Sequence, residues 1–315
     1  HLSQYYGRLP LSQTLAPAIR LAKQGFEVSE RYQQLVGFRL NTLKLSTEAS
    51  SVFLDNEQVP QLGHLIIQPN LATTLEHIAK QGRAGFSQGP VAEKLISGVQ
   101  QAGGIWTLQD LKNYQIKERS PITSTYKGYK ITSAALPSSG GIALSSILNQ
   151  LEHLPFDTAD NTQRKHLIVE AMRRAYFDRS RYMGDADFVT VPTSQLTSKS
   201  YAKDLAASID LISATANQHL PAIDVIEGED TTHFSIIDKD GNRVAATLSI
   251  NYPFGSGFIP AGTGVLLNDE MDDFSAQIGA ANAYGLTGNH ANEIAANKRP
   301  LSSMTPTFIE NDNQL

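Results

Sequence analysis

Residues 231–251 read TTHFSIIDKDGNRVAATLSIN. Polar and apolar residues alternate in its two outer parts, 231–237 and 243–251, and the sequence DKDGN lies between them. Alternation with a period of two is typical of a half-buried strand, and an Asp-Gly turn between two such runs predicts a β-hairpin.

The pairing register of this hairpin follows from its two faces. If the turn is centred on Asp240, partner numbers add up to 480, so Thr231 lies opposite Ser249. This register gathers on one face the polar residues Thr231, His233, Ser235, Thr247, Ser249 and Asn251. It gathers on the other face the mostly apolar residues Thr232, Phe234, Ile236, Leu248 and Ile250. A shift by one residue would mix both kinds on both faces, so we expect the first register, with the apolar face packed on a core. A polar face also suits an ordinary exposed strand, so the pattern alone does not establish catalysis.

Composition excludes several classes of protein. The 315 residues contain 26 basic and 31 acidic side chains, a net charge of −5, and no basic cluster, so we expect no nucleic-acid partner. The absence of cysteine excludes disulfides, thiolate metal sites and a cysteine nucleophile. The long uncharged stretch 131–151 contains the turn sequence PSSGG, so we expect no transmembrane helix.

Helical periodicity dominates residues 1 to about 210. The expected helices are 11–25, 71–82 with Asn70 as N-cap, one beginning at Gly89-Pro90, one after a capping box at Thr107–Asp110, 142–154 and 162–182. In the last of these we expect Val169, Met172, Ala175 and Tyr176 to point inward and several arginines to point outward. Short apolar runs at 52–54 and 129–132 could be strands.

The common catalytic motifs are absent. There is no Gly-x-Ser-x-Gly elbow with a downstream histidine, no phosphate-binding loop and no His-x-x-x-His pair. The acidic run at 270–273 could be a solvated turn or could bind an ammonium group. Ser302 and Ser303 could cap a helix or donate hydrogen bonds to a carboxylate. Each segment alone leaves both readings open.

Several segments nevertheless share their order and spacing with one family. They are TTHFSI at 231–236, TLSIN at 247–251, LLNDEMDDFS at 266–275, KRPLSSMTP at 298–306 and, upstream, LAPAI at 15–19, PSSGG at 137–141, AYFDRS at 175–180 and GDADFV at 184–189. Together they resemble the γ-glutamyltransferases (γ-glutamyltranspeptidases, glutathione hydrolases), which are N-terminal-nucleophile hydrolases. The resemblance extends over nearly the whole chain.

The resemblance implies an α+β fold, a four-layer αββα sandwich. It implies that residues 1–230 are a mostly helical part of a large subunit and that residues 231–315 are part of a small subunit, both in one catalytic domain. The precursor would cleave its own Asp230-Thr231 bond. Two elements of the family have no counterpart here, an upstream arginine and a downstream glycine pair that forms the oxyanion hole. We therefore expect a chain truncated at both ends, with exposed sheet edges and little or no transferase activity by itself.

The resemblance also implies the chemistry of the site. The Thr231 hydroxyl would be the nucleophile, and its freed α-amino group, with a pKa of about 8, would be the base. Ser249 would bind the nucleophile in place of the threonine that is usual in the family. The donor's ammonium would be bound by Asn251, Glu270 and Asp273, and its α-carboxylate by Ser302 and Ser303. Residues 278–288, around Tyr284, match the family's lid loop.

The expected substrates are glutathione and other γ-glutamyl amides, with water, amino acids or dipeptides as acceptors. No cofactor and no metal are expected. By resemblance the protein is periplasmic or secreted. Three alternatives remain open: a related cephalosporin or glutaryl acylase, a γ-polyglutamate transpeptidase, and a noncatalytic homologue.

Overall fold

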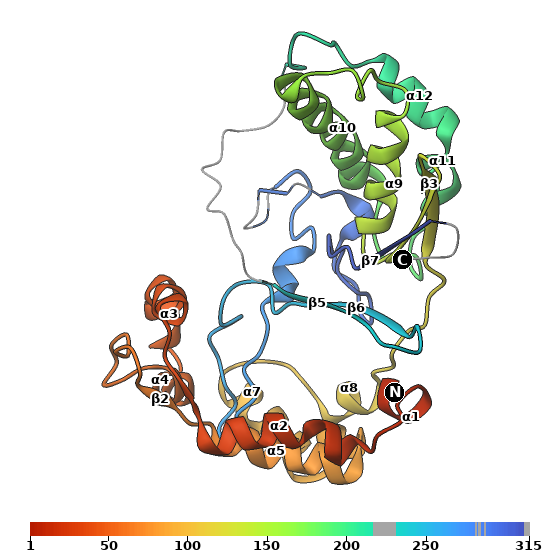
Figure 1. Ribbon diagram of the computed structural model, residues 1–315. Coiled ribbons are helices and arrows are strands. Elements are labelled where there is room, and N and C mark those ends of the chain that lie inside the picture. The colour runs from red at the N-terminus through yellow and green to blue at the C-terminus, as the bar shows by residue number, and fades with distance from the viewer. Residues whose placement is uncertain (217–230, 281, 283–284, 287, 312–315) are drawn as a thin grey trace. The chain divides into compact units, whose positions relative to one another are not determined.

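A computed structural model describes residues 1–216, 231–280, 282, 285–286 and 288–311 (Figure 1). The chain forms two compact units, 1–117 with 250–269, and 118–249 with 270–315. This division differs from the expected one at 230/231, which concerns processing of the chain and stays a prediction. The expected site at Asp230 lies outside the described residues, and Thr231 is the first residue after the gap.

The first unit is mainly helical. Its elements are α1 (Leu2–Tyr5), α2 (Leu11–Gln24), β1 (Phe26–Glu27), α3 (Glu30–Leu43), α4 (Thr47–Phe53), β2 (Leu65–Ile66), α5 (Pro69–Gln81), α6 (Ala84–Ser87), α7 (Gly89–Gln101) and α8 (Leu108–Asn113). α2 ends at Gly25, which adopts a positive φ of 87°, and α8 begins with the expected Thr107–Asp110 capping box. The expected N-cap at Asn70 is wrong: α5 begins at Pro69, two residues earlier than expected, because proline suits the first turn, where its missing N–H costs nothing.

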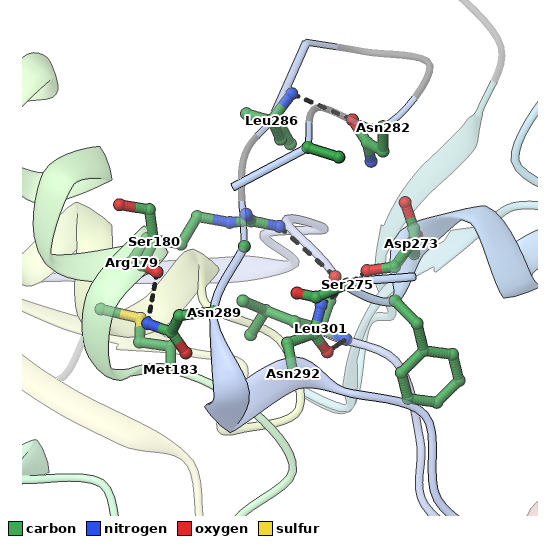
Figure 2. A pocket seen from close by; sticks show the side chains of 13 residues that line it. Arg179, Ser180, Met183, Asp273, Ser275, Asn282, Leu286, Asn289, Asn292 and Leu301 are labelled. Carbon is green, nitrogen blue, oxygen red and sulfur yellow. Dashed lines mark hydrogen bonds between the residues drawn. The ribbon is translucent and has the colours of Figure 1, made fainter. Parts of the chain in front are cut away.

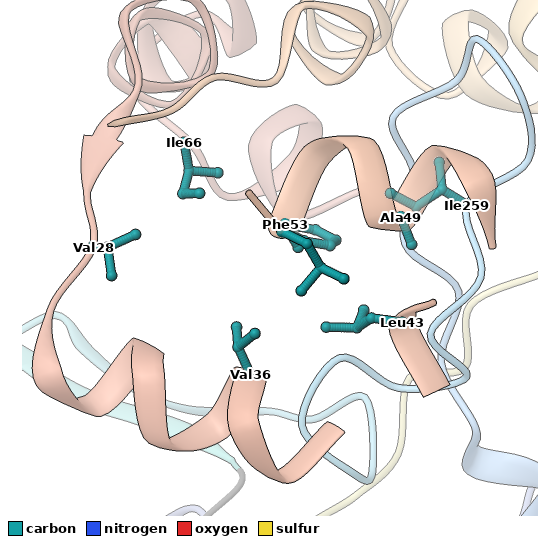
Figure 3. Packing of buried hydrophobic residues seen from close by; sticks show 8 residues of the cluster. Val28, Val36, Leu43, Ala49, Phe53, Ile66 and Ile259 are labelled. Carbon is teal, nitrogen blue, oxygen red and sulfur yellow. The ribbon is translucent and has the colours of Figure 1, made fainter. Parts of the chain in front are cut away.

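A hydrophobic core holds part of this unit together (Figure 3). Val36 and Leu43 of α3 face Phe53 of α4 and Ile66 of β2, and Ile259 joins them from the 250–269 segment. The strand suggested at 52–54 is therefore wrong, because Val52 and Phe53 complete α4, whose apolar face packs on α3. A short apolar run fits either type of element until its packing partner is known.

The second unit combines a sheet with helices. Its elements are β3 (Ile122–Tyr126), β4 (Tyr129–Ser133), α9 (Gly140–Leu151), α10 (Asn161–Tyr182), α11 (Thr193–Leu196), α12 (Lys199–Ala207), β5 (Thr232–Ile237), β6 (Arg243–Leu248), η1 (Glu270–Asp273), η2 (His290–Asn292) and β7 (Thr307–Glu310). Strands β3, β4 and β7 form an antiparallel sheet in that order, and the expected strand at 129–132 is β4. α9 and α10 lie side by side (Figure 1).

Helix α10 has the expected length but only part of the expected inner face. Ala175 is buried as predicted, whereas Val169, Met172 and Tyr176 are exposed. The buried residues recur every four positions and bring charged side chains inward. Arg181 is exposed, as predicted for several arginines, whereas Arg179 is buried against polar partners.

The hairpin of β5 and β6 has the expected register. Thr232 pairs with Leu248 and His233 pairs with Thr247, which confirms the sum of 480 and directs Thr231 towards Ser249. Its apolar face does not pack on a core among the described residues, since Phe234 is 42% and Leu248 57% exposed.

The structure confirms the α+β character. The described strands form three small sheets, β1-β2, β3-β4-β7 and β5-β6. None of the helices in the described ranges is both long and apolar enough to cross a bilayer.

Candidate active site

The candidate nucleophile lies at the start of the β5-β6 hairpin. Thr231 directly precedes β5 and is exposed, and Ser249 directly follows β6. On the same face, the His233 ring lies between two hydroxyls, with Nδ1 2.8 Å from Thr247 Oγ1 and Nε2 3.1 Å from Ser235 Oγ. A row of hydrogen-bonded polar side chains therefore runs along this face of the hairpin, towards its end at Thr231 and Ser249.

Asn251 belongs to the first unit and is described with it. It is 4% exposed, and its backbone adopts a φ of 69°, a region that asparagine tolerates better than most residues. Its Nδ2 donates to the carbonyl of Asp269 at 3.2 Å, and the Asp269 carboxylate accepts from the Tyr252 N–H at 3.0 Å. These bonds close the ends of the 250–269 segment onto each other and fix the Asn251 side chain.

A polar cavity lies in the second unit (Figure 2). It contains about 340 Å³ of empty space, part of which is open to solvent. Its lining residues come from the end of α10, from the end of η1 and from the chain that follows η1 up to Leu301. They are Arg179, Ser180, Met183, Asp273, Phe274, Ser275, Ala280, Asn282, Leu286, Gly288, Asn289, Asn292 and Leu301. The described residues of the expected lid loop, such as Asn282 and Leu286, contribute to this lining, whereas Tyr284 lies outside the described residues.

Asp273 is the acidic group of this cavity. The pKa of its carboxyl is raised to about 7, mainly by burial and then by repulsion from and a hydrogen bond with the neighbouring Glu270, while Arg179 opposes this rise. The Asp273 carbonyl accepts from Asn292 Nδ2 at 2.7 Å, which ties η1 to η2. A half-buried carboxylate beside a second acid favours a cationic ligand.

Ser302 and Ser303 present two hydroxyl groups in one short loop. Ser302 Oγ accepts from the Met304 N–H at 3.1 Å, and Ser303 Oγ accepts from Arg179 Nε at 3.1 Å. Within the described residues neither hydroxyl donates its own proton to a protein acceptor. Both therefore remain donors, which suits an anionic ligand such as a carboxylate.

Two buried charged residues that position this loop were missed by sequence reasoning. Arg179 donates to Ser303 and to the Leu301 carbonyl. Asp185, 0% exposed, accepts from the Arg299 N–H at 3.0 Å and from Arg119 at 3.1 Å. For Arg179 a signal existed: Leu167, Ala171 and Ala175 recur every four residues, and the next position on that face is 179.

Among the residues that the structure describes, no group of three histidine or acidic side chains is arranged to hold a metal ion. The structure brings together Glu270 and Asp273 in η1, and Ser302 and Ser303 in their loop, within the unit that also contains the hairpin. Of the expected site residues, Asn251 alone lies in the other unit.

Comparison with known proteins agrees with the sequence and the geometry. The model of the gamma-glutamyltranspeptidase family matches residues 1–315. The chain belongs to this family. It is 41% identical to a glutathione hydrolase proenzyme of Escherichia coli strain K12 over 98% of this chain and 54% of that protein. The chain thus spans about half the length of this curated relative.

Solved structures support the same assignment. A gamma-glutamyltranspeptidase of Helicobacter pylori superposes with a TM-score of 0.66 and 39% identity over 68% of this chain and 62% of that one. A cephalosporin acylase of Bacillus halodurans superposes with a TM-score of 0.82 and 25% identity over 99% of this chain and 56% of that one. The resemblance seen in the sequence is therefore confirmed, and the fold is that of the N-terminal-nucleophile hydrolases.

Proposed function

We propose that this chain carries the nucleophile and much of the donor site of an enzyme that hydrolyses glutathione and other γ-glutamyl amides and transfers the γ-glutamyl group. The observation that carries the proposal is the polar cluster of the second unit. It combines a half-buried carboxylate, Asp273, with two hydroxyl donors, Ser302 and Ser303, and Arg179 interacts with both sides. A γ-glutamyl group carries one ammonium and one carboxylate, so it needs this combination.

Thr231 would supply the reacting oxygen. Cleavage of the Asp230-Thr231 bond would turn the Thr231 amide nitrogen into an amine, which can accept the proton of the hydroxyl. Thr231 Oγ would then attack the γ-carbonyl carbon and expel the donor's amine, such as Cys-Gly, leaving an acyl-enzyme ester. Water or the amine of an amino acid or dipeptide would attack this ester and restore the hydroxyl.

Ser249 would support the nucleophile from the opposite strand. The observed register directs it towards Thr231, and serine keeps the hydroxyl of the threonine that is usual at this position. One hydrogen bond to Thr231 Oγ would hold its rotamer for attack.

The ammonium of the donor would bind Asn251, Glu270 and Asp273. Charge-assisted hydrogen bonds of this kind contribute about 1.5–3 kcal/mol each. Because burial and the neighbouring Glu270 raise the pKa of Asp273 to about 7, donor binding should strengthen as the pH rises through this value and Asp273 becomes ionised.

The proposal includes two subunits formed from one precursor, which the proenzyme names of the relatives support. It also includes a periplasmic or secreted location, supported only by the sequence resemblance and testable by cell fractionation. Residues 1–315 alone should show little or no transferase activity, since the chain spans about half the length of its relatives.

A pair of matched substrates tests the proposal in the full-length protein. γ-Glutamyl-p-nitroanilide and glutaryl-p-nitroanilide share the scissile amide, and the second lacks the ammonium. We expect kcat/KM to be about 10- to 150-fold higher for the γ-glutamyl compound, the equivalent of one charge-assisted bond. Equal rates, or no turnover of either compound, would contradict the proposal.

The same assay addresses a second candidate, a related acylase. The likeness to the cephalosporin acylase, with a TM-score of 0.82, favours it. An acylase would prefer the glutaryl compound, because its pocket would lack groups that bind an ammonium. A γ-polyglutamate transpeptidase would instead prefer polymeric donors, and a noncatalytic homologue would turn over none of them.

A further inference from the structure

Arg179 is a buried cation in the last turn of α10. It is 6% exposed, and within the described part of the chain no carboxylate forms an ion pair with it. Its hydrogen bonds go to neutral oxygens: Nε donates to Ser139 Oγ and Ser303 Oγ, each at 3.1 Å, and Nη2 donates to the Leu301 carbonyl at 3.3 Å. Burial lowers the pKa of its guanidinium.

An arginine in this setting is costly to the fold. Transfer of a charge out of water is unfavourable unless a partner of opposite charge compensates for it. Here the compensating electrostatic interactions are with Tyr176, whose ring centroid lies 6.0 Å from Arg179 Cζ, and with Asp273, which forms no direct ion pair with Arg179. Core packing alone would be served better by an apolar side chain, so the charge itself needs an explanation.

The bonds of Arg179 converge on one loop. It contacts Leu301 and Ser303 directly (Figure 2 shows the bond to Leu301), and it reaches Ser302 through Ser139. The Ser139 hydroxyl accepts a hydrogen bond from Arg179 and donates one to the Ser302 carbonyl at 2.8 Å. The Ser139 N–H donates to the same carbonyl, also at 2.8 Å. Three consecutive residues thus depend on one guanidinium.

The direction of these bonds matters. Because Nε–H donates to Ser303 Oγ, it occupies a lone pair of that oxygen and leaves the hydroxyl proton for another acceptor. A lysine could supply the charge but could not reproduce the planar geometry that serves Ser139, Ser303 and Leu301 together.

We propose that Arg179 is a positioning residue of the donor site: it orients Ser303 as a donor to the α-carboxylate of the γ-glutamyl group, and its charge, in the wall of the cavity that Asp273 also lines, favours the ionised form of Asp273 that binds the ammonium. This inference rests on the proposed function. In this inference one side chain influences the binding of both the α-carboxylate and the ammonium of the donor. Arg179 itself need not touch the donor.

The charges around Asp273 support the second role. Burial, Glu270 and Asp272 raise the pKa of its carboxyl, and Arg179, which lines the same cavity from α10, lowers it. Loss of the Arg179 charge should therefore move the ionisation of Asp273 above its value of about 7, and donor binding would need a higher pH.

The test uses the full-length protein with Arg179→Gln, Arg179→Lys and the control Arg181→Gln. Arg181 is exposed two residues further along the same helix, so its loss removes the same charge without touching the loop. For each variant, kcat and KM for γ-glutamyl-p-nitroanilide are measured between about pH 5.5 and 9, together with thermal unfolding.

For Arg179→Gln we expect KM to rise about 10- to 100-fold, with a smaller change in kcat, and the acid limb of kcat/KM to move to higher pH. For Arg179→Lys we expect a raised KM with the limb near that of the wild type, because the charge remains. Arg181→Gln should behave as the wild type. A wild-type KM and an unshifted limb in Arg179→Gln would overturn the inference.

A purely structural role predicts a different result, namely lower thermal stability in both Arg179 variants without a shift of the limb, and this too would overturn the inference. If Arg179→Gln does not fold, Ser139→Ala replaces it: this variant removes the link to Ser302 and keeps the charge, so KM should rise and the limb should stay. An unchanged KM would then count against the inference.

Failure of the wild type to turn over γ-glutamyl donors would reject the proposed function, whereas an active wild type with unaffected variants would reject the inference alone.

Discussion

The nucleophile hairpin and the donor-recognition cluster of Asp273, Arg179, Ser302 and Ser303 differ in how they are held. The hairpin is exposed on both faces and depends on neighbours across one turn, such as His233 and Thr247. The cluster is partly buried and depends on partners far away in the chain, since Arg179 and Ser303 are 124 positions apart. Local pairing thus places the reacting hydroxyl, and long-range burial places the groups that recognise the substrate.

The largest expected effect concerns the hairpin. Thr231→Ala in the full-length protein removes the proposed nucleophile and should lower kcat by at least about 10⁴-fold, as loss of a nucleophile does in other covalent enzymes. It should also leave the precursor uncleaved, as seen by gel electrophoresis. Continued cleavage before residue 231 would remove Thr231 from the mechanism.

The second effect concerns the long-range bonds that position the Ser302-Ser303 loop. Asp185→Asn should lower the free energy of unfolding by about 1–3 kcal/mol, because the amide nitrogen places a buried donor against Arg119 or the Arg299 N–H, while Arg119 keeps its ion pair with Asp187. Chemical denaturation measures this. Asp187→Asn is the matched control, since Asp187 pairs with the same Arg119 but is more exposed, and should cost at most about 1 kcal/mol. Equal losses would mean that burial at Asp185 does not matter.

The third effect separates charge from shape in the cluster. Asp273→Asn keeps the size of the side chain and should raise the donor KM about 10- to 150-fold above pH 7. The sign with pH follows from the raised pKa: wild-type binding weakens as the pH falls through about 7 and Asp273 takes up a proton, whereas the variant should lack this limb. A limb that persists in the variant would assign the ionisation to another group.

The smallest effect returns to the hairpin. Ser249→Ala removes one neutral hydrogen bond and should lower kcat about 2- to 10-fold, whereas Ser249→Thr should stay near the wild type because it keeps the hydroxyl. Steady-state kinetics on processed protein measures both. Full activity of Ser249→Ala would show that the pairing with Thr231 has no catalytic role.

The same contrast explains what the sequence could predict. The hairpin register was predictable because the period of two and the Asp-Gly turn are local, and the cross-strand pairing of His233 with Thr247 follows from them. The bounds of α10 were close for a similar reason, since capping is local.

The positioning residues were not predictable in the same way. Whether Arg179 is buried depends on Ser139 and Ser303, and whether Asp185 is buried depends on Arg299, 114 positions away. The roles of Asn251, Glu270, Asp273, Ser302 and Ser303 came from family resemblance and stay predictions. The structure adds that the hydroxyl protons of Ser302 and Ser303 are available and that the pKa of Asp273 is raised.

The most direct test of the account is to trap the acyl-enzyme. Processed full-length protein is mixed with γ-glutamyl-p-nitroanilide, quenched with acid during turnover, digested and analysed by mass spectrometry. The account predicts one γ-glutamyl group in ester linkage on the peptide that begins with Thr231. Turnover with the group on another residue, or with none on Thr231 under conditions that trap esters, would contradict it.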